Sequence, residues 1–392
     1  MTMRNYKYRL YPNKTQITQF NHILDVCRNL YNSSLEERIN EYKTNRKSVT
    51  YYQQRSKLKL DPDKSVYAQI KQDCLRRLDK TFKNFFKPNK SGKKSGFPRF
   101  KSYLRYNSFT YPQSGFKLLN NQYLQLSKIG DIKLVIDRKP LGLIKTCTIK
   151  RDGDQWYVVL CCDITGLTNR IDSTGKLDIG IDVGITNYAT LSNGEQIENP
   201  KYYRKLQHKL KKQQRILSRR NKGSKRRNKQ RLKVAKIHRK IRNQREDFIH
   251  KLSTKLDTNY NRITFEKLNI KGMVRNRKLS KSIHDASWNK LIQYTTYKAE
   301  SANGKVVLVD PRNTSQLCSG CGVLVHKKLD IRQHCCTNCG FELDRDINAA
   351  VNILNKGRVG ITRINAQGDQ VSLETSTSSN GLGTENPIPS RE

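Results

Sequence analysis

Apolar positions near the start of the chain recur with the period of a helix. After a short alternating strand at residues 6–10, Asn13 and Gln16 form a capping box, which predicts that a helix begins there. One face of this helix is apolar and contains Phe20, Ile23, Leu24, Cys27, Leu30, Tyr31 and Leu35. A second stripe of the same period runs over 70–85 and stops before Pro88. These patterns predict a small helical unit near the N-terminus.

Further along, the apolar period changes to two, which is typical of β-strands. The predicted strands lie at 123–126, 132–136, 146–149 and 156–160. Asp152-Gly153 predicts a tight turn before the last of them. Several short strands separated by turns favour a small β-barrel, which the N-terminal strand can join. We therefore predict a barrel domain formed by 1–12 and 103–172, with a helical recognition domain, 13–102, inserted into it.

The rest of the pattern alternates strands with helices, as in an α/β fold. Strands are expected at 177–183, 188–191, 262–265 and 305–309, and helical segments at 201–255, 288–299 and 347–357. They predict an α/β domain formed by 173–310 and 340–362, into which 311–339 is inserted. The last residues, 363–392, are rich in Ser, Thr, Gly and Asn with little to bury, which predicts a disordered tail.

Composition and charge indicate the class of partner. Lys and Arg number 77 against 33 Asp and Glu in 392 residues, a formal net charge of +44. Few soluble proteins carry such an imbalance without binding a polyanion, so nucleic acid is the expected partner. Hydrophobic residues make up only 35 %, but they are clustered, which indicates a globular protein rather than a disordered polycation.

Targeting and membrane signals are not found in the sequence. The N-terminus has no apolar segment with a small-residue cleavage site, so we expect no secretory signal. The longest apolar run, 156–162, is far shorter than the ~20 residues of a membrane helix. Ten cysteines in such a chain are expected to be thiols and metal ligands rather than disulfides. We expect a cytoplasmic protein with no membrane partner.

The sharpest local motif consists of two CxxC pairs separated by fourteen residues. Its members are Cys318, Cys321, Cys336 and Cys339. Two such knuckles can close a tetrahedral thiolate site around one zinc ion, and a site with four protein ligands is structural. Cys335 in place of Cys336 would break the CxxC spacing, and His326 and His334 are less favoured candidates for a zinc ligand. Unrelated cysteines in a core are the alternative interpretation.

Three acidic residues form the second constellation. Asp182 lies within an apolar strand, where a charge is costly unless it is paired or binds a metal. Glu266 lies at the end of another strand, and Asp346 begins a helix. A strand Asp, a strand-end Glu and a helix-start Asp, in this order, are how an RNase H-like fold holds two Mg²⁺ ions. These ions activate water and stabilise the leaving oxygen of a phosphodiester.

Each acid also has a simpler interpretation. Asp182 could close a turn, Glu266 could be a solvated strand end, and Asp346 could cap its helix. The two glycines that flank Asp182 favour a functional role for it. Asp344 and Asp310 are rival acids, which suit a helix start and a turn.

A basic stretch at 201–245 contains no Asp or Glu, and roughly half of its residues are Lys or Arg. A solvated helix normally mixes charges of both signs, so we expect a phosphate backbone to bind here, with an affinity that falls steeply with salt. The expected contacts are Arg219, Arg220, Lys225, Arg226, Arg227, Lys229 and Arg231. A nuclear localisation patch and a merely solubilising surface are the alternatives.

Taken together, these segments resemble the TnpB family of transposon-encoded proteins. The matching segments are 8–12, Gln16, 27–28, 31–32, 96–101, 180–184, 265–268, Trp288, 297–299, 309–311, 314–322, 336–340, 344–350 and Asn352. The resemblance covers nearly the whole chain apart from the tail, and the order acid, acid, zinc knuckles, acid is highly specific. The doubled cysteine at 335–336 and the long polar tail depart from the family pattern.

The resemblance implies an RNA-guided DNA endonuclease, related to the type V CRISPR effectors, with an RNase H-like (RuvC-like) α/β core interrupted by a zinc ribbon. Carried over by position, Asp182, Glu266 and Asp346 would bind two catalytic Mg²⁺ ions, and the four cysteines would bind one structural Zn²⁺. The helical unit and the wedge-like barrel would grip the heteroduplex of guide and target and read a short flanking motif.

The partners implied by the resemblance are a guide RNA from the transposon end and double-stranded target DNA, with no small-molecule substrate. Such a protein acts at the nucleoid, in the cytoplasm of a prokaryotic cell. A non-catalytic zinc-ribbon regulator that binds RNA or DNA and derives from such a nuclease is the competing interpretation, but all three acids are present. A transposase that joins the element's ends is less favoured, because no strong His-x-His and Tyr nucleophile arrangement is found.

Overall fold

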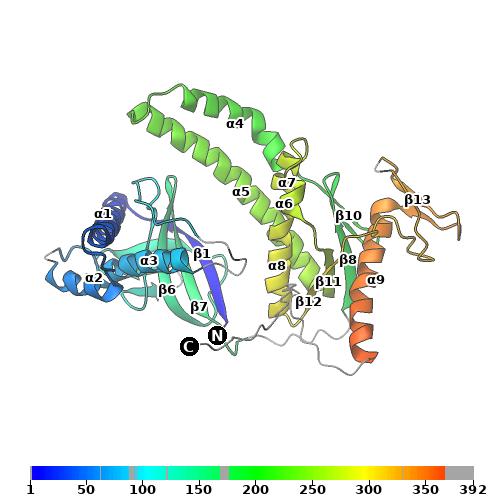
Figure 1. Cartoon of the computed structure of the whole chain (residues 1–392), viewed down its shortest axis with the longest axis horizontal. Helices are drawn as coiled ribbons and strands as arrows, with labels where there is room; N and C mark the ends of the chain where they lie inside the picture. Colours follow the sequence, from blue (N-terminus) through cyan, green and yellow to red (C-terminus); the bar gives the residue numbers. More distant parts are fainter. Residues whose placement is uncertain are drawn as a thin grey trace, which may run out of the picture. The chain divides into compact units, whose positions relative to one another are not determined.

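The computed structural model describes residues 2–61, 63–87, 92, 95–120, 122–167, 176–328 and 330–366 (Figure 1). The predicted tail from residue 367 onward lies outside these ranges. The chain divides into two compact units. The first comprises Met1–Asn169 and Lys209–Arg239, and the second comprises Arg170–His208 and Lys240–Glu392. Among the described helices, none has the length and the apolar character needed to cross a membrane.

An antiparallel sheet forms the body of the first unit, with seven strands in the part of the chain that is described. The strands are β1 (Met3–Tyr11), β2 (Ser108–Tyr111), β3 (Phe116–Leu119), β4 (Tyr123–Leu126), β5 (Gly130–Val135), β6 (Leu143–Asp152) and β7 (Gln155–Asp163). Their order is β2-β6-β7-β1-β5-β4-β3, so β1 lies between β7 and β5. The N-terminal strand therefore joins this sheet, and the helices that follow it are inserted between β1 and β2.

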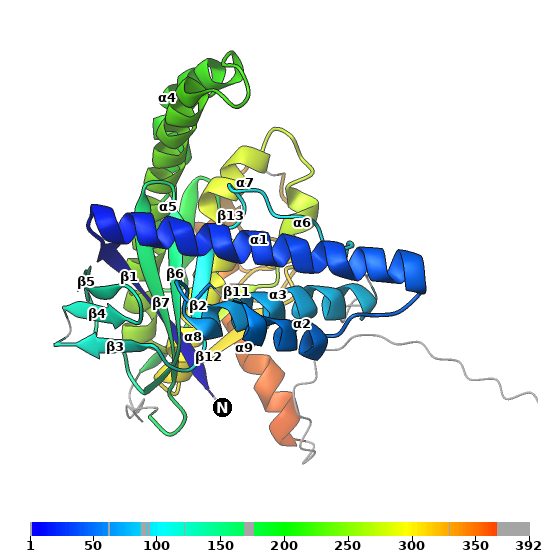
Figure 2. The ribbon, with the colours of Figure 1, turned by 90° about the vertical axis from the view of Figure 1, so that its left-hand side faces the viewer.

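The inserted helices share one core with the sheet. They are α1 (Lys14–Asn45), α2 (Tyr51–Lys57) and α3 (Ala68–Phe86), with a 3₁₀ turn at Leu58–Leu60. The predicted capping box is confirmed: the Asn13 side chain accepts from the Gln16 amide at 2.8 Å, and the Gln16 side chain accepts from the Asn13 amide at 3.0 Å. α1 and α3 lie side by side (Figure 2), and Phe20 of α1 contacts Phe109 and Trp156 of the sheet.

The basic stretch forms a helical hairpin of α4 (Tyr202–Ser218) and α5 (Lys225–Asn259) (Figure 1). The sequence predicted one long helical segment, but the structure breaks it at a turn where Gly223 has a φ of +87°. Glycine adopts this left-handed conformation without steric cost. Within the first unit, α5 is anchored to the β6–β7 turn, because Arg239 and Lys236 both pair with Asp154 at 2.8 Å.

A mixed sheet forms the centre of the second unit, with five strands among the described residues. The strands are β8 (Leu177–Val183), β9 (Asn187–Leu191), β10 (Gln196–Glu198), β11 (Tyr260–Glu266) and β12 (Lys305–Val309). Their order is β10-β9-β8-β11-β12, in which β8, β11 and β12 are parallel and β9 is antiparallel to its neighbours. The helices of this unit, besides the ends of the hairpin, are α6 (Ile270–Met273), α7 (Ser280–Ala286), α8 (Trp288–Ser301) and α9 (Arg345–Ala366). The predicted mixed α/β architecture is confirmed at this level.

α9 is longer than the sequence predicted, because it passes through Gly357 and includes residues 363–366 of the predicted tail. Gly357 is not a helix end: a Cβ there would lie 2.4 Å from the hydroxyl of Thr264 in β11. Likewise, a Cβ at Gly180 of β8 would lie 2.1 Å from the Ala350 carbonyl. Both glycines therefore let α9 approach the sheet closely, which a side chain would prevent.

Candidate active site and metal centre

Two of the three predicted acids lie on neighbouring parallel strands. The register pairs Phe265 of β11 with Ile181 of β8, so the next residues, Glu266 and Asp182, are neighbours at the carboxyl ends of these strands. Glu266 is only 7 % exposed, and Asp182 is partly buried. The carboxyl ends of parallel strands are where α/β sheets present their functional side chains.

Asp346 joins them from the first turn of α9. Because α9 packs closely on β8 at Gly180, its first turn lies beside the ends of the strands. The helix cap is Asp344 rather than Asp346: its Oδ1 accepts from the amides of Asp346 at 2.8 Å and Ile347 at 3.1 Å. Asp346 is therefore not needed for capping, and it lines the same cavity as Asp182 and Glu266.

A cavity of 530 Å³ lies at this end of the sheet. Its acidic lining residues are Asp182, Glu266 and Asp346, and its cationic ones are Lys327, Lys328, Arg332 and Arg345. Of the described residues, the rivals Asp310 and Asp344 are not part of this lining. Asp310 instead closes a turn by accepting from the Arg312 amide at 3.0 Å. A cavity lined by both carboxylates and cations suits metal ions together with an anionic substrate.

Burial and neighbouring charges disfavour the ionised form of Asp182, and burial disfavours that of Glu266. Burial, followed by the charges of Glu266 and Asp346, raises the pKa of Asp182 to about 7, and Arg345 opposes this shift. Burial also raises the pKa of Glu266, against a hydrogen bond from Thr314. A divalent cation would offset this repulsion, and carboxylate oxygens are the ligands that Mg²⁺ prefers. The donor set therefore fits magnesium.

Among the described residues, the four cysteines form a group of potential metal ligands and the three acids do not. The features of the acids that suit a metal are their shared cavity and their carboxylate oxygens.

Two arginines hold Asp346. Arg345 lies 3.3 Å from one carboxylate oxygen of Asp346, and Arg332 lies 3.6 Å from the other. Arg345 also donates to the Ile331 carbonyl at 3.1 Å. These contacts orient the carboxylate and connect it to the segment before β13 (Gln333–Cys335).

Thr314 supports Glu266, a role that no sequence pattern indicated. Its side chain is buried, and its hydroxyl donates to Glu266 Oε1. The same hydroxyl oxygen lies 3.0 Å from the Pro311 carbonyl. Thr314 and Glu266 are 48 residues apart, so only the folded chain reveals the contact.

Two asparagines of α9 fasten the cysteine-containing segment to the helix. Asn348 accepts from the Ser319 amide at 2.9 Å and donates to the Leu317 carbonyl at 2.8 Å. Asn352 donates to the carbonyls of Thr314 and Leu317 at 2.9 and 2.7 Å. Their spacing of four residues places both on one face of a helix, a signal that was available in the sequence.

The two glycines that flank Asp182 have structural explanations. Gly180 makes room for α9, as described above. A Cβ at Gly184 would lie 2.8 Å from the Asn187 carbonyl in the turn between β8 and β9. Close packing therefore accounts for both glycines, so they do not by themselves indicate a catalytic role for Asp182.

Four thiols gather into one group. Among the described residues, the single set of potential ligands whose atoms all lie within 4.8 Å of one another is Cys318, Cys321, Cys336 and Cys339. The sulfur atoms of Cys318 and Cys339 are 3.8 Å apart, and those of Cys321 and Cys336 are 3.6 Å apart. Four sulfurs at ~2.3 Å from a tetrahedral zinc ion are about 3.8 Å from one another. The arrangement therefore fits one zinc ion.

Each CxxC pair is closed by a tight turn. In both pairs, the amide of the glycine after the second cysteine donates to the carbonyl of the first cysteine at 2.9 Å. Gly322 and Gly340 have φ values of +77° and +70°, which favour glycine. Cys335, His326 and His334 lie outside the thiol group in the described structure. The segment between the pairs leads into an antiparallel hairpin of β13 and β14 (Glu342–Asp344).

The basic residues at the α4–α5 turn fall into two groups. Arg227 donates to the carbonyls of Leu217 and Arg220 at 2.8 and 2.6 Å, and Arg220 donates to the Arg226 carbonyl at 2.6 Å. Arg220 and Arg227 thus help to close the turn. The exposed members are Arg219, Lys225, Arg226 and Lys229, and Arg231 is half-buried. The exposed group is the one available to a phosphate backbone.

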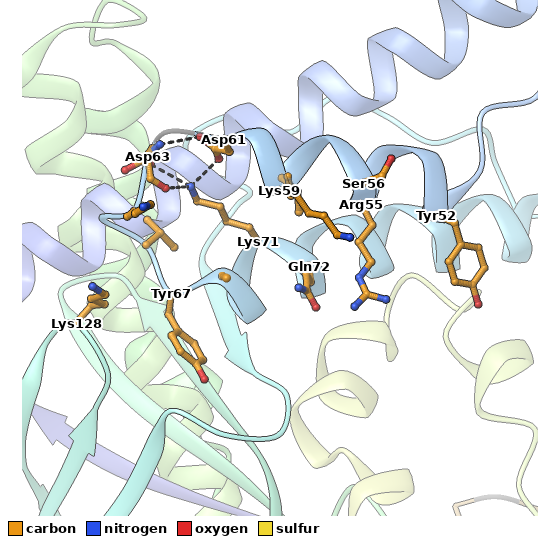
Figure 3. Close-up of a pocket in the computed structure, with 14 residues that line it drawn as sticks. Tyr52, Arg55, Ser56, Lys59, Asp61, Asp63, Tyr67, Lys71, Gln72 and Lys128 are labelled. Atoms are coloured by element: carbon orange, nitrogen blue, oxygen red, sulfur yellow. Dashed lines mark hydrogen bonds and ion pairs between the residues drawn. The ribbon is translucent and has the colours of Figure 1, made fainter.

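A second polar cavity, of 660 Å³, lies in the first unit (Figure 3). Its lining comes from α2, the segment before α3, α3 itself and the β4–β5 turn, and includes Tyr52, Arg55, Ser56, Lys59, Lys64, Gln72 and Lys128. Two acids beside it are engaged internally: Lys71 binds Asp61 at 2.7 Å and Asp63 at 3.3 Å. Hydrogen bonds from Ser65 lower the pKa of Asp63 to about 2. The remaining cations give this cavity a positive rim.

Three family models match successive parts of the chain. A helix-turn-helix domain matches residues 1–47, a probable transposase matches 167–277, and a Cas12f1-like TNB domain matches 288–353. In this structure the first of these regions is one strand and one long helix. The second contains Asp182 and Glu266, and the third contains the four thiols and Asp346.

Similar proteins extend over the whole chain. A Streptomyces pristinaespiralis protein named "Putative RNA-guided DNA endonuclease" is 34 % identical over 99 % of this chain and 96 % of its own length. The Escherichia coli K12 protein of that name, InsQ, is 28 % identical over 91 % of this chain and 92 % of its own. TnpB-like protein L79 of Acanthamoeba polyphaga mimivirus is 28 % identical over 56 % of this chain and 45 % of its own.

A solved complex of Cas12f1 with sgRNA and target DNA also aligns with the chain. The alignment covers 91 % of this chain and 99 % of the Cas12f1 chain, with 17 % identity and a TM-score of 0.35. At that score the likeness supports no conclusion about fold or function.

Proposed function

The chain belongs to the TnpB family, and from this we propose that it is an RNA-guided endonuclease of a transposable element that cuts double-stranded DNA beside a short flanking motif. The full-length similarity to proteins named as endonucleases supports the activity. One cavity, that of Asp182, Glu266 and Asp346, would serve both strands.

The observation that carries the proposal is the convergence of these three carboxylates, from two parallel strands and one helix, on a cavity that also contains four cations. When bound there, two Mg²⁺ ions would activate a water molecule and neutralise charge on the scissile phosphate. Asp182, Glu266 and Asp346 would hold the ions. Thr314 orients Glu266.

The cations of the cavity have a separate role. Arg345 and Arg332 orient Asp346. Lys327 and Lys328 lie in the same lining and would attract the DNA backbone. The positive charge thus brings an anionic strand toward carboxylates that would otherwise repel it.

We infer that the five-stranded sheet with α9 is a RuvC-like, RNase H-like core and that the thiol group binds one structural zinc ion. The thiol spacing supports zinc. Because the segment between Cys321 and Cys336 carries Lys327, Lys328 and Arg332, the ion would also hold cationic residues of the catalytic cavity in place.

The remaining charge suits the nucleic-acid partners. Exposed cations at the α4–α5 turn would bind the phosphate backbone of the guide RNA or its heteroduplex with DNA. The cavity of Figure 3 suits reading of the flanking motif, because Arg55 and Gln72 carry side chains that form paired hydrogen bonds with guanine and adenine edges.

The decisive experiment compares Asp182→Asn with Asp310→Asn. The protein is purified with its guide RNA and incubated with Mg²⁺ and a plasmid that contains the target and the flanking motif. We expect Asp182→Asn to bind the target and not cut it, because it removes one carboxylate of the cavity. Asp310→Asn, an exposed acid outside the cavity, should cut at the wild-type rate.

Wild-type protein that binds but does not cut with Mg²⁺, Mn²⁺ or Co²⁺ would overturn the nuclease assignment in favour of a regulator. Sequencing the RNA that copurifies with the protein tests guidance separately. One discrete RNA that overlaps the end of the gene is the expected result, and bulk cellular RNA removed by salt would contradict guidance.

A further inference from the structure

Four phenylalanines at the end of α3 and in the segment after it pack on one another more than on the core. They are Phe82, Phe85, Phe86 and Phe97. Phe82 stacks on Phe86 with ring centroids 6.3 Å apart, and Phe97 meets Phe82 and Phe85 edge to face at 5.8 and 5.3 Å. Phe86 is 69 % exposed and Phe97 is 48 % exposed. Only Phe82 of the four packs against the core of the unit. The group therefore presents aromatic surface that the fold itself does not use.

These rings line a cavity of 900 Å³ between α1, the segment before α2, and α3. Its other aromatic members are Tyr42, Tyr51 and Tyr52, and Ile39 and Val49 complete the apolar lining. The volume lies at the upper end of the range of small-molecule sites, about 300–1,000 Å³. The cavity is therefore large enough for a flat ring to enter and lie against its aromatic lining.

The charges around the cavity are positive. Arg38, Lys43 and Lys83 line it, and Asp79 is the acidic residue among its described lining residues. Asp79 is already engaged, with one oxygen 3.5 Å from Arg38 and the other 2.9 Å from Lys83. An incoming ring that carries an anionic group would therefore meet a cationic rim.

We propose that this aromatic cavity binds an unpaired nucleobase of single-stranded nucleic acid, with the adjoining phosphates at Lys43 and Lys83; the proposal rests on the function proposed above. Aromatic rings that stack on bases beside cations that track phosphates are the general means of binding single strands. Paired bases expose no face to stack on, so duplex is not the ligand. A second copy of the chain, with the same net charge of +44, would be repelled rather than attracted.

The test uses the full-length protein and fluorescein-labelled oligothymidylate, oligouridylate and a duplex of mixed sequence. Phe86→Ala and Phe97→Ala each remove one exposed ring, and Tyr123→Ala removes a ring of β4 that is 42 % exposed and outside the cavity. We expect each Phe variant to weaken single-strand binding about tenfold, with an unchanged salt dependence because no phosphate contact is lost. Duplex binding and Tyr123→Ala should match the wild type.

Stacking is observed directly with a 2-aminopurine base in the oligonucleotide. The wild-type protein should quench its fluorescence, and Phe86→Ala should not. Unchanged affinity and unchanged quenching in both Phe variants would overturn the proposal. A wild-type dimer in light scattering that Phe86→Ala dissociates, without loss of oligonucleotide affinity, would overturn it in favour of a second copy.

The two oligonucleotides distinguish the source of the base. A larger loss with oligouridylate assigns the cavity to the guide RNA, and a larger loss with oligothymidylate assigns it to a displaced DNA strand. Plasmid cutting is measured in parallel. If the wild-type protein cuts and the Phe variants bind single strands as tightly as it does, the proposal for the aromatic cavity is wrong and the nuclease assignment stands. If the Phe variants bind single strands tenfold more weakly but the wild-type protein never cuts, the nuclease assignment is wrong and the proposal for the aromatic cavity stands.

Discussion

The thiol group and the carboxylate cavity both gather metal-binding side chains, but the chain builds them in opposite ways. The thiols come from one short segment, 318–339, and two tight turns bring them together. The carboxylates come from 182, 266 and 346, and burial, together with the charges of the other two acids, raises the pKa of Asp182 to about 7. The first site is closed by local geometry, whereas the second depends on the sheet, α9 and the side chains that hold the acids.

The difference reflects what each site does. Four ligands that surround an ion leave no position for a substrate, so the thiol group contributes structure and stability rather than chemistry. A site that acts on a phosphodiester must hold buried carboxylates close to one another before substrate and metal arrive, which lowers the stability of the fold. Substitutions at the two sites should therefore move stability in opposite directions.

The largest effect is expected for Cys336→Ser. Removal of one thiolate from a closed site should release the zinc ion and unfold the ribbon, because structural zinc contributes roughly 10–16 kcal/mol of apparent binding energy in zinc-finger peptides. We expect bound zinc to fall from one to none by elemental analysis and the melting temperature to drop. The neighbouring Cys335→Ser should keep both, and loss of zinc from that variant would reverse the assignment of ligands.

Glu266→Gln should show the opposite pattern. Loss of one carboxylate should slow plasmid cutting about 10³-fold or more, as for the removal of a catalytic group. The melting temperature without divalent metal should stay the same or rise, because burial disfavours the ionised Glu266. Calorimetry and cutting rates of the same preparations test both. A fall of several degrees would show that the carboxylate stabilises the fold and would break the contrast between the sites.

A smaller effect is expected for Thr314, which supports Glu266. Thr314→Val keeps the shape of the side chain but removes the hydroxyl that donates to Glu266. We expect cutting to slow by about tenfold, as for other residues that orient metal ligands. Thr314→Ser retains the hydroxyl and serves as the control. Equal rates for the two variants would mean that Glu266 is positioned without Thr314.

Substitutions in the basic turn between α4 and α5 are expected to change the affinity for nucleic acid a few-fold. Arg226→Gln and Lys229→Gln should each reduce the dependence of the logarithm of duplex affinity on the logarithm of salt concentration by about 0.9, one phosphate contact apiece. Arg227→Gln should instead loosen the turn, because Arg227 bonds two backbone carbonyls. Hydrogen exchange of the turn amides separates the two cases. Identical salt slopes in all variants would exclude a phosphate contact here.

The smallest effect concerns Asp154, whose pKa is shifted in the direction opposite to that of Asp182. Burial disfavours its charge, but Lys236 and Arg239 outweigh this and lower its pKa to about 2. Its anchoring of α5 is therefore complete above the ordinary pKa of Asp, about 4, and is lost as the pH falls through about 2. Hydrogen exchange at 225–239 should rise over this range in the wild type. Asp154→Asn should show no such dependence, and a wild-type profile without it would contradict the ion pairs.

Sequence patterns predicted the parts of the fold that depend on local physics. The capped start of α1 and the bounds of β4, β8 and β12 follow from capping chemistry and periodicity, and the structure confirms them. α2, β13 and β14 are too short for a period to emerge. Gly357 was assigned to a helix end because its closeness to Thr264 exists only in the folded chain.

In the candidate site, too, the parts that depend on local sequence could be predicted and the parts that depend on tertiary packing could not. The four cysteines could be identified from spacing alone, and the structure brings their sulfurs together. The three acids needed the resemblance to a family as well, because each one alone suits a turn, a strand end or a cap. Thr314 and Arg332 could not be assigned to Glu266 and Asp346 from sequence, since their contacts depend on how separate segments pack. The domain boundaries stay predictions.

α9 places strict limits on its own length. Asp346 in its first turn faces the cavity, Asn348 and Asn352 fasten the cysteine segment, and Gly357 lies against Thr264 of β11. An inserted residue would rotate everything after it by about 100°. No insertion or deletion within 346–357 could therefore keep all of these contacts.

The loop between Cys321 and Cys336 is free of that constraint, because the thiols are set by turns at its two ends. It nevertheless carries Lys327, Lys328 and Arg332 into the cavity. A change in its length would alter the positive charge that meets the substrate and, through Arg332, the orientation of Asp346, while the backbone positions of the three acids stay set by the sheet and α9. Among related chains, gaps and insertions should thus collect in this loop, where cutting can be tuned, and be missing from the first turns of α9.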